Sequence, residues 1–301
     1  MTSTASNAST ASNAPSPALL VSFSPTISVE ALREAFARDG YVVIRGLLND
    51  ESLEPVRAAI DARVAVIRAE LEAEGLVTPA PAAPFAHNLV PLSAHIARYG
   101  RGWTDALAGP GIHDLHRAPP LLGVLRALLG DSVCGHKQFN LRPKLPGQEL
   151  TTVPWHQDTA YYGPQTVADT IITTWVPLVS VSANNGCMQI VPGSHKEGAI
   201  DHDANVGEGQ FLQLRVTPKP ERVLTVAMEP GDVLVMHNLL WHCSLPNNSD
   251  GIRWSIDLRF YTPDTPSAKE LLWGFPQPWL LCGGPTVPVA KWCDWYKKLA
   301  G

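Results

Sequence analysis

The stretch Arg253-Trp-Ser-Ile-Asp-Leu-Arg-Phe-Tyr261 carries the clearest strand signal in the chain, because polar and apolar side chains alternate along it without a break. Successive side chains of an extended strand point to opposite faces, so the stretch predicts a β-strand with one polar and one apolar face. The apolar face carries Trp254, Ile256, Leu258 and Phe260, and the polar face carries Arg253, Ser255, Asp257 and Arg259.

Further strand signals precede this stretch, and turn residues separate them. Strand-forming residues are concentrated in Val133–Arg142, Thr170–Val181, Met188–Val191, Val223–Met228 and Val233–His237. The turn signals are Asn184-Asn185-Gly186, Pro192-Gly193 and Pro230-Gly231-Asp232. Short strands at such spacing, broken by Gly, Pro and Asn, are typical of a β-sandwich or a β-barrel.

The first half of the chain predicts helices. Ser28 is placed to cap a helix that Gly40 would stop, and Tyr41–Ile44 then predicts a buried strand. A longer helix after Asn49 shows apolar residues every three or four positions, namely Leu53, Val56, Ile60, Val64, Ile67 and Leu71. Pro119–Leu129 predicts another apolar helix. We therefore expect an all-β core whose outer face is covered by flanking helices.

The domain organisation expected from composition is simple. Residues 1–16 consist almost entirely of Ser, Thr, Ala and Asn and cannot bury enough apolar surface to fold, so we expect a disordered tail. Residues 17–301 are expected to form a single domain. Residues 77–92 are rich in Pro and Ala and predict an irregular connection.

The bulk properties predict no more than a soluble cytosolic domain. A net charge of −5 does not favour a nucleic-acid partner, and the chain contains no apolar run long enough to span a membrane. No Lys or Arg precedes Arg33, so the N-terminus lacks the basic region of a secretory signal. The five cysteines form no Cys-x-x-Cys pair, which favours reduced thiols in a cytoplasmic protein. The oligomeric state is not readable from the sequence.

The first chemical signal is Trp155-His156-Gln157-Asp158. Side chains two positions apart on extended chain point the same way, so His156 and Asp158 can reach one ion. One imidazole and one carboxylate form two thirds of the facial triad of non-haem iron(II) oxygenases. An isolated His-x-Asp is also what a surface strand end presents, so the motif needs a second signal.

That second signal is His242, followed 11 positions later by Arg253 at the start of the alternating strand. A guanidinium on a buried strand needs an anion, and the distal carboxylate of 2-oxoglutarate would offer a bidentate partner. The alternative is an ion pair with an internal acid such as Asp257. His237 is a rival third metal ligand, and His242 is preferred for its spacing to the arginine.

Other histidines receive different interpretations. His195 closes the Pro-Gly-Ser-His turn and is expected to be structural. Asp201-His202-Asp203 lies in a polar loop and is expected to be solvated. His87 and His113 lie in the irregular region and are weak candidates for substrate contact. Trp273, Trp279, Trp292 and Trp295 predict either a cap packed on the β core or a lid over an apolar substrate pocket.

Taken in order, His156-Gln-Asp158, Pro192-Gly-Ser-His195, Pro230-Gly-Asp232 and His242-Cys-Ser-Leu-Pro-Asn-Asn-Ser-Asp-Gly-Ile-Arg253 resemble the phytanoyl-CoA dioxygenase-like family. The resemblance implies a double-stranded β-helix, or jelly roll, with N-terminal helices packed on its larger sheet. It implies the metal ligands His156, Asp158 and His242. It also implies co-substrate contacts from Arg253, Ser244, Gln138 and Trp175. Cys243 departs from the family pattern, which more often has Gly there.

The resemblance implies an iron(II)- and 2-oxoglutarate-dependent dioxygenase. Such an enzyme uses O2 and releases succinate and CO2, and its expected reaction is hydroxylation of an unactivated C–H bond in a small metabolite. A non-catalytic jelly-roll binding protein is an alternative, and a cupin-type metalloprotein is another, although the latter would leave Arg253 unexplained. Residues 77–117, 198–220 and 263–301 should select the substrate and carry no motif that names it.

Overall fold

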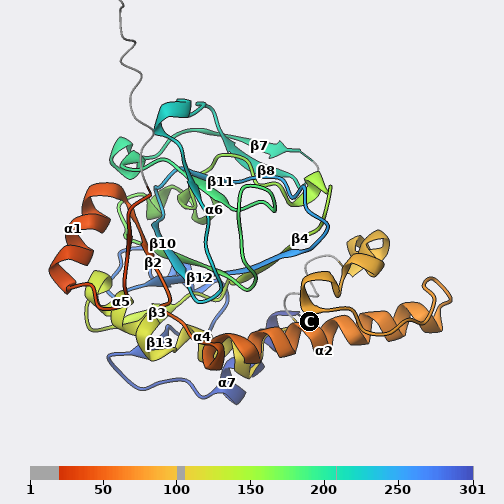
Figure 1. Cartoon of the computed structure of the whole chain (residues 1–301). Helices are drawn as coiled ribbons and strands as arrows, with labels where there is room; N and C mark the ends of the chain where they lie inside the picture. Colours follow the sequence, from red (N-terminus) through yellow and green to blue (C-terminus); the bar gives the residue numbers. More distant parts are fainter. Residues whose placement is uncertain (1–19, 100–105, 208, 301) are drawn as a thin grey trace, which may run out of the picture.

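The computed structural model describes residues 20–99, 106–207 and 209–300, and shows a β core flanked by helices (Figure 1). The predicted tail, residues 1–16, lies outside the described residues. Among the helices described, none has both the length and the apolar character that a membrane crossing requires. The core consists of a large sheet, a small sheet and a separate hairpin.

The large sheet contains eight strands and carries most of the polar residues discussed below. Its order is β1 (Ser22–Phe23), β2 (Tyr41–Ile44), β10 (Val233–His237), β5 (Ile172–Pro177), β12 (Arg253–Tyr261), β3 (Val133–Gly135) and β13 (Trp279–Cys282), and β4 (Asn140–Lys144) also pairs with β12. All pairs are antiparallel except β1 with β2. The strand predicted over Arg253–Tyr261 is confirmed with the same bounds.

The small sheet faces the large one. Its order is β11 (His242–Ser244), β6 (Met188–Ile190) and β9 (Leu224–Val226), and the hairpin consists of β7 (His202–Val206) and β8 (Phe211–Leu214). The two sheets share one apolar cluster, in which Val43, Trp175 and Leu234 of the large sheet meet Ile190 and Val226 of the small sheet. The interior between the sheets is therefore apolar at this end.

The helices are α1 (Val29–Asp39), α2 (Asp50–Ala73), α4 (Pro110–His116), α5 (Pro119–Leu129), α6 (Thr159–Tyr162) and α7 (Val289–Ala300). Short 3-10 turns span Phe85–His87, Val90–Tyr99, Glu149–Thr151, Pro164–Thr166, Ser194–Glu197, Pro220–Arg222 and Glu270–Leu272. The predicted caps are confirmed: Ser28 Oγ accepts from the Ala31 N–H, and the Asn49 side chain accepts from the Ser52 N–H. Gly40 ends α1 at φ 76°, a conformation that glycine adopts without strain.

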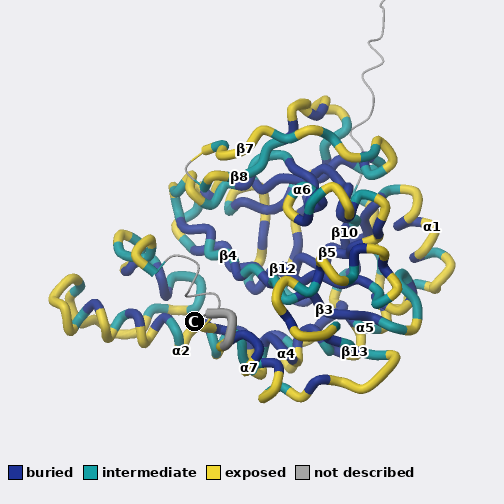
Figure 2. The backbone as a smooth tube through the Cα atoms, turned by 180° about the vertical axis from the view of Figure 1, so that it is seen from behind, coloured by how far each residue is buried: buried dark blue, intermediate teal, exposed yellow. Residues whose placement is uncertain are grey.

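The alternation along β12 divides the large sheet into two faces. Trp254, Ile256, Leu258 and Phe260 pack in one cluster with apolar residues of α1, α2, α4, α5 and α7, so this face is covered by helices. The opposite face carries the arginines and the aspartate and points toward the small sheet. Figure 2 shows the central strands as buried and the outer turns of α1 and α2 as exposed. A strand with a charged face is thus buried on both sides.

The tryptophan-rich C-terminal segment divides between the two roles that its sequence predicts. Trp279, Trp292 and Trp295 belong to the helix-covered apolar cluster, and the rings of Trp279 and Trp292 lie 4.9 Å apart. These three side chains form the predicted cap. Trp273 is 38% exposed and lines a cavity described below.

The Pro230-Gly231-Asp232 turn leads into β10 and requires a glycine at its centre, which a substitution can test. Gly231 has φ +98°, and a Cβ there would lie 2.5 Å from the Leu48 carbonyl oxygen. Gly231→Ala is therefore expected to lower the free energy of unfolding by about 1–3 kcal/mol, measured by urea denaturation. Gly147→Ala is the matched control, because Gly147 also has positive φ but no atom within 4 Å of its Cβ position. An equal loss of unfolding free energy in both variants would show that the close contact with the Leu48 carbonyl oxygen does not contribute.

Candidate metal centre and adjoining cavities

Two histidines and one aspartate converge between the sheets. His242 begins β11, and the backbones of His156 and His242 are joined by two hydrogen bonds, of 2.9 and 3.1 Å. Asp158 follows in the same segment, immediately before α6. Asp158 Oδ1 lies 3.6 Å from His156 Nε2 and 3.7 Å from His242 Nε2, and all three residues are buried. These are the only three such residues in the described part of the chain that could hold one metal ion together.

Both imidazoles are oriented in the same way. His156 Nδ1 lies 2.8 Å from the Pro154 carbonyl oxygen, and His242 Nδ1 lies 2.9 Å from the Leu240 carbonyl oxygen. A carbonyl only accepts, so each Nδ1 carries a proton, which leaves Nε2 as the ring nitrogen that can bind a metal ion. Burial also lowers the pKa of His242 to about 4, which keeps that ring neutral. Two imidazole Nε2 atoms beside a carboxylate fit a divalent cation of the iron(II) type.

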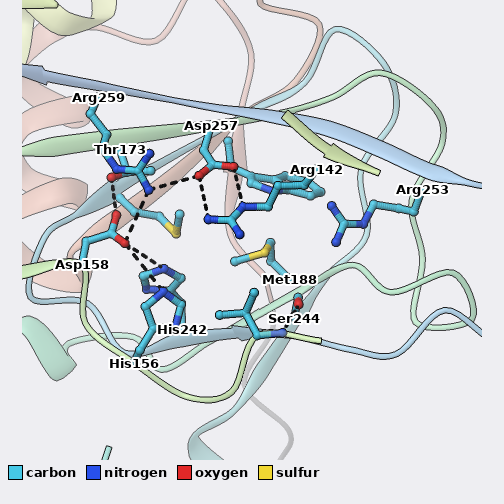
Figure 3. A pocket seen from close by; sticks show the side chains of 13 residues that line it. Arg142, His156, Asp158, Thr173, Met188, His242, Ser244, Arg253, Asp257 and Arg259 are labelled. Carbon is cyan, nitrogen blue, oxygen red and sulfur yellow. Dashed lines mark hydrogen bonds and ion pairs between the residues drawn. The ribbon is translucent and has the colours of Figure 1, made fainter. Parts of the chain in front are cut away.

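The carboxylate is held by the neighbouring strands. Thr173 Oγ1 donates to Asp158 Oδ2 at 2.5 Å, and Arg259 Nη2 lies 3.8 Å from Asp158 Oδ1 (Figure 3). Burial by itself raises the pKa of Asp158, but Arg259 and the two histidines outweigh it and hold the pKa well below its usual range. Asp158 is therefore a fixed anion. Sequence reasoning did not assign these roles to Arg259 or Thr173, although Arg259 lies on the polar face of the alternating strand.

Arg253 is buried across the same space. Its guanidinium lies 5.5 Å from the centre of the Trp175 ring, and Nη1 donates to Ser255 Oγ. Asp257 is taken by other partners, because it accepts from Arg142 at 3.0 Å and from Arg259 at 3.1 Å. Arg253 Nε finds no acceptor among the described residues. A buried guanidinium with an unused donor needs an anion that this part of the chain does not supply.

Ser244 lines the same cavity as Arg253. Its Oγ accepts from Lys144 Nζ at 2.8 Å and from the Val153 N–H at 3.1 Å. A serine oxygen has two lone pairs and one proton, so two accepted hydrogen bonds leave the proton available for an anion. Lys144 was missed in the sequence, although its backbone pairs directly with that of Arg253. Burial, together with Arg253, lowers the pKa of Lys144 to about 6.

Two cavities meet at the His-Asp-His cluster. The smaller is lined by the three cluster residues, by Arg253, Ser244 and Trp175, and by seven others, namely Arg142, Val153, Thr173, Met188, Met236, Asp257 and Arg259. The larger has a volume of about 570 Å³ and reaches His156 and Asp158. Gln138 lines the larger cavity, away from the group around Arg253. Of the four predicted co-substrate residues, the structure thus brings three together.

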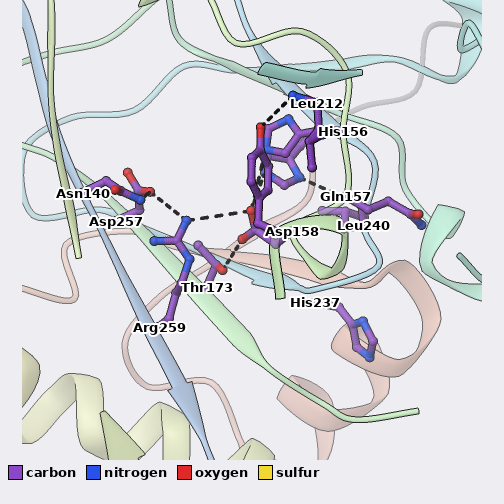
Figure 4. Close-up of polar contacts among 12 residues, drawn as sticks. Asn140, His156, Gln157, Asp158, Thr173, Leu212, His237, Leu240, Asp257 and Arg259 are labelled. Carbon is purple, nitrogen blue, oxygen red and sulfur yellow. Dashed lines mark hydrogen bonds and ion pairs between the residues drawn. The ribbon is translucent and has the colours of Figure 1, made fainter. Parts of the chain in front are cut away.

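The remaining histidines lie elsewhere. His237 shares the helix-covered face with Val233 and Val235, and its ring packs on Phe36 and His195 instead of the cluster (Figure 4). His113 stacks on Trp279, and neither His113 nor His87 lines the two cavities.

The segment at the start of β7 corrects the prediction for His202. The sequence predicts that Asp201-His202-Asp203 is solvated, and both aspartates are exposed, but His202 is half-buried and its Nε2 accepts from the Gln157 N–H at 3.1 Å. Its Nδ1 lies 2.7 Å from the Ile200 carbonyl oxygen. The Gln157 side chain donates to the Gly198 and Leu239 carbonyls. His202 and Gln157 therefore hold the segment between the two metal-cluster residues, a contact that only the tertiary fold creates.

The chain is similar to proteins of known activity. The sequence profile of the family described as Phytanoyl-CoA dioxygenase (PhyH) matches residues 36–255. Peroxisomal phytanoyl-CoA dioxygenase of Mus musculus is 26% identical over 241 residues, which cover 77% of this chain and 68% of the mouse protein. The 1-deoxypentalenic acid 11-beta-hydroxylase of Streptomyces exfoliatus is 32% identical over 249 residues, covering 76% of this chain and 80% of the hydroxylase.

A solved structure shares the fold. The nickel complex of the non-heme monooxygenase ThoJ superposes with a TM-score of 0.57 at 19% identity, over 89% of this chain and 96% of that protein. The family match covers most of the chain and includes His156, Asp158, His242 and Arg253. The chain belongs to the phytanoyl-CoA dioxygenase family of non-haem iron(II)- and 2-oxoglutarate-dependent oxygenases.

Proposed function

We propose that this enzyme hydroxylates an unactivated C–H bond of a small metabolite, with 2-oxoglutarate converted to succinate and CO2. One observation carries the proposal. Two imidazole Nε2 atoms and one carboxylate converge in a cavity, and the guanidinium of Arg253, whose Nε finds no acceptor among the described residues, lines the same cavity. A metal at one end and an anion acceptor at the other match the two ends of a 2-oxo dicarboxylate.

Some residues would bind the metal and the co-substrate, and others orient those binding residues. His156, Asp158 and His242 would hold iron(II), and Arg253 with the Ser244 hydroxyl would bind the distal carboxylate of 2-oxoglutarate. When bound, iron(II) and 2-oxoglutarate supply the oxidising chemistry, while the protein orients the substrate. Thr173 and Arg259 keep Asp158 in one orientation. Lys144 does the same for Ser244, since it takes one of the two lone pairs of the hydroxyl.

The apolar lining of the small cavity would also exclude water from the co-substrate. Val153, Trp175, Met188 and Met236 line it beside the polar residues, and all four are buried. Trp175 also lies beneath the Arg253 guanidinium, which favours the charged form of the arginine through the face of the ring. With the co-substrate bound, these side chains would leave little space for water in the cavity.

We further propose that residues 17–301 form one domain with the double-stranded β-helix, or jelly-roll, fold. The support is a large and a small sheet that share an apolar cluster, with helices on the outer face of the large sheet. The cluster of three ligands then lies between the sheets, at the segment where His156 bridges to β11.

The alternative of a non-catalytic binding protein makes the opposite prediction for one measurement. Full-length protein loaded with iron(II) under anaerobic conditions, then given 2-oxoglutarate and air, is expected to form succinate slowly even without a primary substrate. Succinate and 2-oxoglutarate are quantified by liquid chromatography, with metal-free protein as the control. Stoichiometric iron and 2-oxoglutarate binding without any succinate would favour the binding protein instead.

A further inference from the structure

The larger cavity reaches the metal cluster from a direction that the co-substrate does not use. Its wall includes His156 and Asp158 but neither Arg253 nor Ser244. Its volume of about 570 Å³ lies within the range of small-molecule sites. Arg142, Val153 and Arg259 line both cavities, as do His156 and Asp158. A molecule in the larger cavity would therefore reach the metal while 2-oxoglutarate occupies the smaller one.

One part of this cavity is apolar and exposed. Tyr161, Leu150 and Trp273 line it, and each is a large apolar side chain that is between 37% and 40% exposed. Phe211 and the buried Phe139 extend the same surface inward. Trp273 has φ +46°, which is a strained conformation for a bulky residue and is typical of functional positions. An apolar surface of this kind favours a substrate with an apolar body.

The polar part of the cavity carries an excess of positive charge. Lys137, Arg142 and Arg259 line it, and Asp158 is the only acid among the described residues that do so. A bound metal ion would offset the negative charge of Asp158. The nearby Asp257 is shared between Arg142 and Arg259 and cannot neutralise both. The lining of the cavity thus carries more cationic than anionic side chains.

Two of these cations, Arg142 and Arg259, have N–H donors that their partner Asp257 does not use. Arg142 pairs with Asp257 through Nε and Nη2, and a third of its side chain remains exposed. Arg259 is 5% exposed, and its Nε and Nη1 find no acceptor within the described part of the chain. Buried charged donors are costly to leave unpaired, so an acceptor that arrives with a ligand would be bound favourably.

We propose that the primary substrate is a carboxylic acid with an apolar body. Its carboxylate pairs with the Arg142 side of the cavity, where Lys137 adds charge, and its body lies against Trp273 and Tyr161. This inference rests on the proposed function, since it names the substrate class of the same site. A cationic or neutral substrate would leave the positive excess in place.

Matched ligands provide the test. Naphthalene-2-acetic acid, its primary amide and the corresponding 2-(2-naphthyl)ethylamine share one apolar body and differ in the charge of the head group. Full-length protein is loaded with nickel(II) and saturating 2-oxoglutarate, and ligand binding is followed by calorimetry and by tryptophan fluorescence. The acid is expected to bind at least about tenfold more tightly than the amide, and the amine is expected to bind weakest. Equal or tighter binding of the amide or the amine would overturn the inference.

Variants locate the binding. Arg142→Met and Lys137→Met are each expected to reduce the preference for the acid over the amide to less than about threefold. Trp273→Ala is expected to weaken acid and amide by the same factor, because it removes only the apolar contact. Lys219→Met, at an exposed lysine outside the cavity, is the matched control and should keep the full preference. An undiminished preference in both cavity variants would overturn the placement of the carboxylate.

The outcome is separable from that of the proposed function. If the acid competes with 2-oxoglutarate, it occupies the smaller cavity and the inference fails. Protein that forms succinate but shows no preference for acids contradicts the substrate class alone. Protein that prefers acids in the larger cavity but forms no succinate supports the anion site and contradicts the proposed reaction.

Discussion

Asp158→Ala is expected to weaken iron(II) binding by at least about 100-fold and to abolish succinate formation. The carboxylate is one of three convergent donors, and it is the only one that carries a charge to offset the cation. Loss of even an outer partner of a metal ligand typically costs 10–100-fold in affinity, so loss of the ligand itself should cost more. Anaerobic equilibrium dialysis with iron(II), or the visible spectrum of the cobalt(II) protein, measures binding without relying on activity.

His237→Gln is the matched control for that experiment. His237 lies five positions before His242 but packs on Phe36 and His195 at the helix-covered face. This variant is therefore expected to keep wild-type metal affinity, whereas His242→Gln should lose it. Circular dichroism checks that each variant is folded. Metal affinity that survives in Asp158→Ala but falls in His237→Gln would mean that the cluster has been assigned wrongly.

Arg253→Met is expected to raise the KM for 2-oxoglutarate by about 100-fold with a smaller change in kcat. Removing one partner of a buried charge pair typically costs 2–5 kcal/mol, and 2.7 kcal/mol corresponds to a factor of about 100. Methionine fills much of the space of the arginine stem, so the change removes mainly the donors. The measurement is succinate formation at varied 2-oxoglutarate concentration, together with direct titration of 2-oxoglutarate into the nickel(II) protein.

Arg253→Lys separates charge from geometry. Lysine keeps the positive charge but cannot reproduce the planar fork, so its KM should lie between those of the wild type and of Arg253→Met. Arg222→Met is the matched control, because Arg222 is also an arginine beside a tryptophan ring but is 39% exposed and lines neither cavity. An unchanged KM in Arg253→Met would show that the co-substrate carboxylate is bound elsewhere.

The local elements were readable because their signals are short-range. A helix cap needs one side chain and the next turn of backbone, so Ser28 and Asn49 predicted the starts of α1 and α2 correctly. The alternation in β12 gave its two faces, because the side-chain period of a strand depends on no other segment. Val133–Arg142 was less accurate, since the structure breaks it into β3 and β4 with an irregular segment between them.

The candidate site was predictable to the extent that its residues are close in sequence or carry a spacing. His156 and Asp158 belong to one motif, and His242 was distinguished from His237 by its distance to Arg253. The alternation of side chains along β10 gives the physical reason why His237 points away from the metal cluster. His237 continues the outward face of Val233 and Val235, whereas His242 begins the strand that bridges to His156.

From sequence alone came the fold class, most helices and strands, the faces of β12 and the pattern of two histidines, one aspartate and one arginine. Only the tertiary structure showed that Arg259 and Thr173 hold Asp158, that Lys144 holds Ser244, and that a second cavity with more cations than anions in its lining adjoins the cluster. Backbone preferences act over a few residues. The walls of a cavity come instead from segments far apart in the chain, and which of their charges remain unpaired is settled only when those segments pack together.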